Sequence, residues 1–160
     1  MKERFVKLTA AEVRGILDGT LTSFRRPIRP PRGGPMVTQW VEDRCPFGSP
    51  GDRLWVRESW MPGYDHRSVD AGDDASICEV FYRGVSKDHN DCEFRPAPDD
   101  IAEEWSRTYS EDGDDDPRWR SAGSMPRWAS RLDLEVVGSQ PEKDAAGAWE
   151  WVTGFRRVQP

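Results

Sequence analysis

The chain has 160 residues and a formal net charge of −6, with 36% hydrophobic and 32% charged residues, which favours one compact domain with long loops over two independent domains. No window approaches the about 20 consecutive apolar residues of a membrane-spanning helix. The first residues lead into no apolar stretch typical of a secretion signal, so we expect a cytoplasmic protein with no membrane partner.

The first 35 residues predict a strand, a helix and a loop. Residues 4–8 form a candidate strand, and Thr9 and Glu12 have the spacing of a capping box, in which each side chain bonds the other's backbone N–H. A helix over residues 10–17 should follow. Residues 22–26 then read as extended, before prolines and glycines exclude regular structure up to residue 35.

The clearest strand covers residues 53–60, after a turn rich in proline and glycine. Successive side chains of a strand alternate between its faces, so Leu54, Val56, Glu58 and Trp60 share one face. If Leu54 and Val56 face the core, Glu58 also points inward, and an inward carboxylate needs a partner.

Residues 61–123 are predicted to be a long, irregular, acidic insertion within a single domain of residues 1–160. Polar loops are broken only by a strand over 78–83 and a short helix near 99–107. Order returns with a half-buried strand at 132–136 and a last strand at 149–158. Five or six short strands with one short N-terminal helix predict an α+β fold built on a small mixed β-barrel.

The cysteines, histidines and acidic run predict no metal site and no cofactor. Cys45, Cys78 and Cys92 are odd in number and lack CxxC spacing, and only His66 and His89 could join them as ligands. A nucleophilic Cys45 would lack a histidine nearby in sequence, and both histidines lie in polar segments. The run of residues 112–116 lacks the glycine and glutamate spacing of a calcium loop.

Charge is divided between two regions of opposite sign. Residues 61–116 contain 17 acidic against 5 basic residues, a net −12, while the rest contains 12 acidic against 18 basic residues, a net +6. Clustered arginines suit phosphate groups or planar bases. The alternative is a solvated surface with ordinary ion pairs to the acidic insertion. The clusters contain Arg25, Arg26, Arg29, Arg32, Arg53, Arg57, Arg118, Arg120, Arg127, Arg131, Arg156 and Arg157.

Two strings carry a resemblance to a known family: PGDRLWVRESW at residues 50–60 and MPRWASR at residues 125–131. With the first helix, the Gly19–Arg26 segment and a tryptophan-rich last strand, they make the chain similar to the ASCH domain family, in particular its phage- and prophage-encoded members. The resemblance covers about 4–60 and 124–158. It implies a PUA-like β-barrel that binds RNA or nucleotides in a cleft; some members resemble acetylcytidine amidohydrolases and ribonucleases.

The chain departs from the family at two positions. Enzymatic members carry a GxKTxTxR-like string after the first helix, in which the lysine and the second threonine contribute to catalysis. Here Leu21 and Phe24 stand at those positions. Neither side chain can activate a nucleophile, which argues against amidohydrolase activity without removing the hydrolase alternative.

We expect the ligand site at the mouth of the barrel, where Arg25, Arg26 and Glu58 would converge beside Trp60 as a flat apolar wall. Glu58 would be the acid or base if the protein is an enzyme. The alternative is that Glu58 and one arginine form a buried structural ion pair. The expected ligand-binding residues are Thr22, Arg25, Arg26, Trp60, Arg127 and Ser130.

Three functions follow from these patterns. The first is a module that binds RNA, a nucleotide or a modified base in a basic cleft. The second is a hydrolase of RNA or of a modified nucleoside, with Glu58 as acid or base and Arg25 or Arg26 stabilising negative charge. The third is a phage accessory protein whose acidic insertion binds a host protein, in which case the cytoplasm is that of the host cell.

Overall fold

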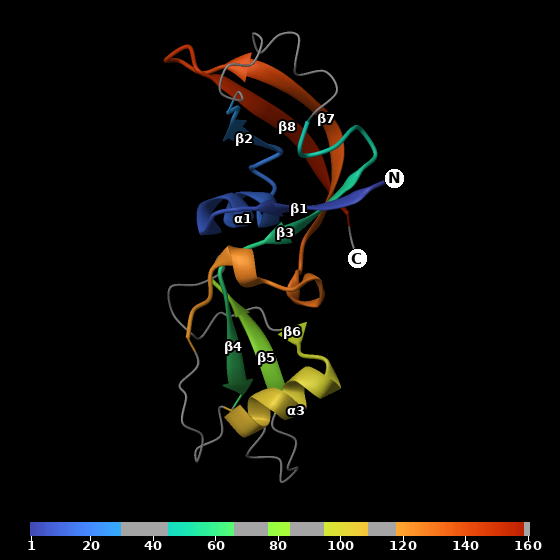
Figure 1. Cartoon of the computed structure of the whole chain (residues 1–160), viewed down its shortest axis with the longest axis vertical. Helices are drawn as coiled ribbons and strands as arrows, with labels where there is room; N and C mark the ends of the chain where they lie inside the picture. The colour runs from blue at the N-terminus through green and yellow to red at the C-terminus, as the bar shows by residue number, and fades with distance from the viewer. Residues whose placement is uncertain (30–44, 66–76, 84–94, 109–117, 159–160) are drawn as a thin grey trace. The chain divides into compact units, whose positions relative to one another are not determined.

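Two α-helices and eight β-strands make the described part of the chain a mixed α+β fold (Figure 1). The computed structural model describes residues 1–29, 45–65, 77–83, 95–108 and 118–158. No helix in those ranges is long and apolar enough to cross a membrane. The elements, in chain order, are β1 (Glu3–Lys7), α1 (Ala10–Leu17), β2 (Ser23–Pro27), β3 (Arg53–Arg57), β4 (Trp60–Asp65), β5 (Ile77–Tyr82), β6 (Arg95–Pro96), α3 (Asp99–Thr108), the 3-10 turns η3 (Ala122–Ser124) and η4 (Arg127–Ala129), β7 (Asp133–Lys143) and β8 (Trp149–Val158).

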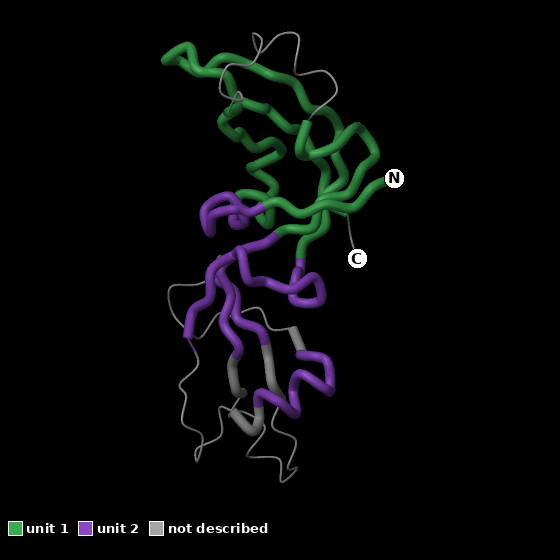
Figure 2. The backbone as a smooth tube through the Cα atoms, in the orientation of Figure 1, with its two compact units in different colours: residues 1–6, 15–56, 132–160 green, residues 7–14, 57–131 purple. Residues whose placement is uncertain are grey.

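The contacts divide the chain into two compact units, each built from segments far apart in sequence (Figure 2). Unit 1 contains Met1–Val6, Gly15–Val56 and Leu132–Pro160. Unit 2 contains Lys7–Arg14 and Arg57–Arg131, and so takes in the whole of the predicted insertion.

The five-stranded sheet, which belongs almost wholly to unit 1, has the strand order β1-β3-β7-β8-β2. Its longest pairing is the antiparallel β7–β8 hairpin, with a register shift between Val136 and Gly138, and β2 pairs with the far side of β8. The hairpin turn is held by Asp144, whose carboxylate accepts the N–H groups of Ala146 and Ala148 at 2.9 and 2.7 Å. The core of this unit includes Phe24 and Phe155, whose rings stack at 5.8 Å.

Unit 2 contains the second sheet, with the order β4-β5-β6, and helix α3 packs against β5. Antiparallel pairing sets Trp60 opposite Tyr82, so β4 begins where β5 ends. The core of this unit contains Trp60, Val80, Tyr82, Ala97, Trp105, Met125 and Ala129.

The local patterns of the sequence are confirmed in several places. Thr9 N–H donates to Glu12 Oε2 at 2.8 Å and Glu12 N–H to Thr9 Oγ1 at 3.3 Å, as the capping box requires. The predicted helix at 10–17 and strand at 149–158 match α1 and β8. On the strand predicted at 53–60, Leu54, Val56 and Glu58 are all buried, as the alternation predicted.

The predicted small barrel is not confirmed, because the strands of the described residues lie in two sheets and no closed barrel is found among them. In the insertion, β5 and α3 match the strand predicted over 78–83 and the helix predicted near 99–107, whereas β4 and β6 were not predicted. Strand β4 escapes prediction because it includes Pro62. The N–H of Trp60 donates to Arg120, which lies on the side of β4 away from β5. The nitrogen of Pro62, two residues later, points to that same side. Pairing of β4 with β5 therefore does not need an N–H from Pro62.

The turn before β3 is fixed by Asp52. Its carboxylate accepts the backbone N–H groups of Lys2 at 2.7 Å and Ser49 at 3.1 Å, and these hydrogen bonds lower the pKa of Asp52. Gly48 has a φ of +93°, and a Cβ there would lie 2.7 Å from Asp52 Oδ2. Only glycine fits both the backbone conformation and the space.

We predict that Asp52→Ala lowers the free energy of unfolding at pH 7, because two backbone donors lose their acceptor. A carboxylate with a lowered folded-state pKa stabilises above its ordinary value of 3.8, and that contribution is lost as pH falls through the folded-state value. Urea unfolding of both proteins from pH 7 to pH 3 should therefore show a difference that shrinks below about pH 4. Ser49→Ala, which keeps its backbone donor, is the control; a difference independent of pH would contradict the account.

Candidate functional site

The residues predicted to form one cleft divide between the two units. Unit 1 holds Thr22, Arg25 and Arg26, and unit 2 holds Glu58, Trp60, Arg127 and Ser130. Each group therefore has its own neighbours, which decide what its side chains can do.

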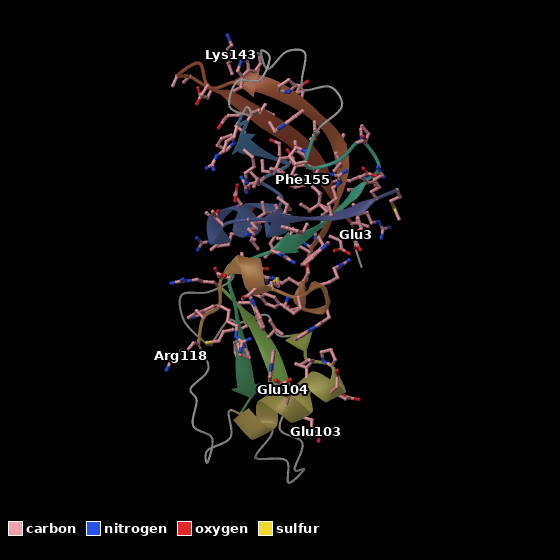
Figure 3. All side chains as sticks on the ribbon, in the orientation of Figure 1. Glu3, Glu103, Glu104, Arg118, Lys143 and Phe155 are labelled. Carbon is pink, nitrogen blue, oxygen red and sulfur yellow. The ribbon has the colours of Figure 1, made fainter. Side chains whose placement is uncertain are left out.

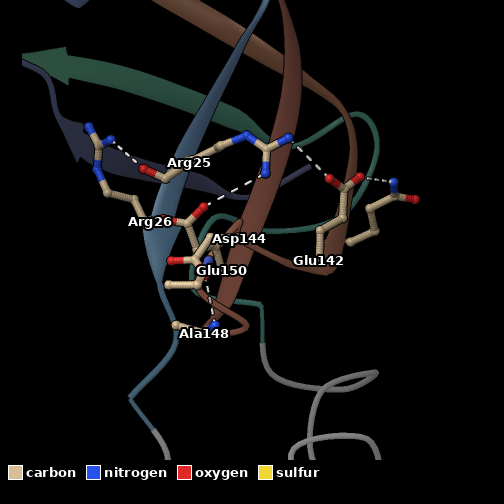
Figure 4. Close-up of polar contacts among 8 residues, drawn as sticks. Arg25, Arg26, Glu142, Asp144, Ala148 and Glu150 are labelled. Atoms are coloured by element: carbon tan, nitrogen blue, oxygen red, sulfur yellow. Dashed lines mark hydrogen bonds and ion pairs between the residues drawn. The ribbon is translucent and has the colours of Figure 1, made fainter.

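Arg25 lies between two carboxylates in unit 1 (Figure 4). Its guanidinium is 3.1 Å from Glu142 and 3.7 Å from Glu150, two residues that stand opposite each other on β7 and β8. Like charges directly opposite each other destabilise a sheet, so Arg25 on the adjoining strand offsets their repulsion. Arg25 with its two carboxylates carries a net charge of −1, so this guanidinium is already compensated.

Arg26 lies on β2, and Thr22 is the residue immediately before that strand. The Arg26 guanidinium lies 5.2 Å from the centre of the Phe24 ring, and the Thr22 carbonyl accepts the N–H of Phe155 at 3.0 Å. Phe24 is 2% exposed and packs against Phe155 and Phe47. A core position explains why this residue is apolar.

Glu58 and Arg131 form a buried, bidentate ion pair in unit 2. Arg131 Nε donates to Glu58 Oε1 at 2.8 Å, and Arg131 Nη2 donates to Oε2 at 3.0 Å. The side chains are 2% and 7% exposed. Parallel N–H donors on both carboxylate oxygens make the strongest form of this interaction. Arg131 is therefore the arginine partner that Glu58 would need in a buried structural ion pair.

Tyr82 supports the pair from one side. The Arg131 guanidinium lies 4.3 Å from the centre of the Tyr82 ring, and the Tyr82 hydroxyl donates to the carbonyl of Ala129 at 2.7 Å. Ser130, between Ala129 and Arg131, is 3% exposed. A pair enclosed in this way orients the segment before β7, and a ligand in solvent has little access to it.

Trp60 is a core residue of unit 2. It is 3% exposed, its ring stacks with that of Trp105 at 6.1 Å, and the Arg120 guanidinium lies 5.0 Å from its centre. Its indole N–H donates to Ser124 Oγ at 3.3 Å. The flat, accessible wall expected here is therefore covered, because Trp60 is the first residue of β4 rather than the last of β3.

Hydrogen bonds bring residues 57–60, 82–83 and 118–131 together at one end of the second sheet; we call these segments the arginine-rich end. Arg120 and Trp60 exchange backbone hydrogen bonds at 2.7 and 3.2 Å, Arg83 N–H donates to Ser59 at 3.2 Å, and Arg57 donates to the Gly123 carbonyl at 3.2 Å. These segments contain six arginines and one acidic residue, Glu58, a net +5. The arginines are Arg57, Arg83, Arg118, Arg120, Arg127 and Arg131.

Four of these arginines are exposed: Arg83, Arg118, Arg120 and Arg127. In Figure 3, Arg118 lies away from the carboxylates of Glu103 and Glu104 on α3. Glu58, the acidic residue of these segments, is neutralised by Arg131. The segments of the arginine-rich end therefore carry a net charge of +5 in a chain whose net charge is −6, and four of their arginines are exposed.

Sequence reasoning missed Trp119 and the role of Arg131. Trp119 is 38% exposed, and the Arg83 guanidinium lies 5.7 Å from its ring centre. It stood in a stretch predicted to be irregular, where the Arg-Trp-Arg order of residues 118–120 was the available signal. For Arg131, the signal was the inward Glu58, which required a cation.

No group of three or more histidine, cysteine or acidic side chains suited to a metal ion is found within the described ranges. Cys45 is a partly buried free thiol. His66, His89, Cys92, the acidic run 112–116 and Arg32 lie outside those ranges.

Comparison with known proteins finds no family profile, no curated protein and no solved structure that matches the chain. Its own residues and their geometry therefore carry the functional proposal.

We predict that replacing either member of the ion pair destabilises the protein more than replacing both. Arg131→Met or Glu58→Leu leaves a buried charge without its partner, at a cost of about 3–5 kcal/mol, whereas an apolar pair of similar volume removes both charges. Urea unfolding of the two single variants and the double variant measures the coupling. Additive losses would mean that the two side chains do not act as a pair.

Proposed function

We propose that the chain is an ASCH-like module that binds RNA or a nucleotide, and that it does so through the arginine-rich end of unit 2. The single observation that carries the proposal is that these segments have a net charge of +5 in a chain with a net charge of −6, and that four of their arginines are exposed. Guanidinium groups suit phosphates because their planar donors match the oxygen geometry. A positive patch on an acidic protein also directs a polyanion to one surface.

The ion pair gives the ASCH resemblance a structural meaning. Glu58 belongs to the string at residues 50–60, and Arg131 ends the string at residues 125–131, so the strings that carry the resemblance meet in one buried contact. Met125 and Ala129 of the second string are also core residues. We include in the proposal that the fold is a variant of the PUA-like architecture.

Binding without hydrolysis is the form of the function that we propose. Both carboxylate oxygens of Glu58 accept hydrogen bonds from Arg131, which favours a scaffolding role over that of acid or base. Leu21 and Phe24 lack the groups of the enzymatic relatives. The binding of a host protein by the acidic insertion stays a prediction.

The test is the binding of a fluorescein-labelled 20-nucleotide RNA to the full chain, measured by anisotropy between 50 and 300 mM salt. Arg83→Ala/Arg118→Ala removes two exposed guanidiniums of the arginine-rich end. Each lost phosphate contact should weaken binding about fivefold at 0.1 M salt and reduce the slope of log K against log salt by about 0.7.

The matched control is Arg25→Ala/Arg156→Ala, which changes the net charge equally but removes arginines that already pair with Glu142 and Glu135. We expect its RNA affinity to stay close to that of the parent. An equal loss in both double variants would show a response to total charge alone, and a parent chain that binds no RNA or nucleotide would refute the proposal.

A further inference from the structure

Trp119 is the large hydrophobic side chain that unit 2, within the described ranges, leaves exposed. The other tryptophans in those ranges are buried or partly buried, whereas Trp119 is 38% exposed. Tryptophan gains more from burial than almost any other side chain, and this unit has an aromatic core in which to place it. Packing in the core therefore does not explain why this indole remains at the surface.

The backbone next to Trp119 is fixed by pairing. Arg120 exchanges two backbone hydrogen bonds with Trp60, which places it beside the start of β4. The Arg120 guanidinium lies over the Trp60 ring. Trp119 is the residue before this paired position, and its own ring contact is with Arg83.

Arg83 completes the surroundings of the ring. Its backbone N–H donates to Ser59, which anchors it beside the start of β4, and its guanidinium lies 5.7 Å from the centre of the Trp119 ring. Trp119 is 38% exposed, so part of this residue reaches solvent beside the guanidinium. Arg118 and Arg120, on either side in sequence, are themselves exposed.

An aromatic ring with a guanidinium against it fits one repeating unit of a nucleic-acid strand. The ring accepts the face of a base, and the guanidinium accepts a neighbouring phosphate. We propose that Trp119, with Arg83 against its ring, is a stacking site for an unpaired base of single-stranded RNA. This inference rests on the proposed RNA-binding function and specifies which form of RNA the arginine-rich end prefers.

The ring favours a single strand over a duplex. Bases within a duplex have their faces covered by neighbouring base pairs, and an RNA duplex offers proteins mainly phosphates and 2′-hydroxyl groups. Exposed tryptophan and arginine also occur at protein interfaces. The net +5 of the arginine-rich end, whose one carboxylate is neutralised, favours a polyanionic strand over a protein surface of mixed charge.

The experiment compares two labelled RNAs, an unstructured 12-nucleotide oligouridylate and a 12-base-pair duplex, in titrations of the full chain. Trp119→Ala should weaken oligouridylate binding by about 5- to 150-fold, the range for loss of one stacked base. Duplex binding should be nearly unchanged, because Trp119→Ala leaves every phosphate-binding guanidinium in place. Trp119→Phe should recover part of the lost affinity, since it restores an aromatic face.

The matched control is Phe5→Ala, which removes an aromatic side chain that is 47% exposed in unit 1. It should leave both affinities unchanged. Oligouridylate should also quench tryptophan emission of the parent, and most of that quenching should disappear in Trp119→Phe. Far-UV circular dichroism confirms that each variant is folded.

Three outcomes would overturn the stacking site. Equal oligouridylate affinity in the parent and Trp119→Ala, or equal losses for oligouridylate and duplex, would leave RNA binding in place and remove the role of Trp119. Competition by polyglutamate as effective as that by unlabelled oligouridylate would identify a general polyanion or protein surface. A parent chain that binds neither RNA would instead refute the proposed function itself.

Discussion

The buried ion pair between Glu58 and Arg131 is the interaction on which the organisation of unit 2 depends. It joins the residue between β3 and β4 to the residue that leads into β7, two points 73 positions apart in sequence. Separating the pair would leave a buried carboxylate and a buried guanidinium without a partner, which is strongly destabilising. The two segments must therefore stay together whenever the protein is folded. Tyr82 and Ala129 enclose the pair from β5 and η4, and so tie the second sheet to the same point.

Arginines have different neighbours in the two units, and this difference decides which surface suits an anion. In unit 1, Arg25 offsets Glu142 and Glu150, and Arg156 pairs with Glu135. At the arginine-rich end, Arg131 pairs with Glu58, the single carboxylate of those segments. The buried pair thus has an electrostatic consequence as well as a structural one, because Arg131 neutralises the carboxylate of Glu58.

Patterns set by near neighbours could be read from the sequence, and partners set by distant pairing could not. The Thr9–Glu12 capping box and the alternation at Leu54 and Val56 depend on spacing alone, and both are confirmed. The inward direction of Glu58 followed from the same alternation, but its partner depends on how segments 73 residues apart meet. Trp60 was expected to be accessible because its place on a new strand, beside Trp105, depends on the pairing of β4 with β5.

The RNA affinity of the folded double variant Glu58→Leu/Arg131→Met most directly tests whether the buried pair is scaffold and the surface arginines bind the ligand. The substitution removes one negative and one positive charge, so the net charge of the arginine-rich end and its exposed guanidiniums stay the same. If the pair is scaffold and the surface arginines bind the ligand, affinity should stay within about twofold of the parent value, with the same salt slope. A folded variant that no longer binds RNA would place the ligand at the pair itself and contradict the account.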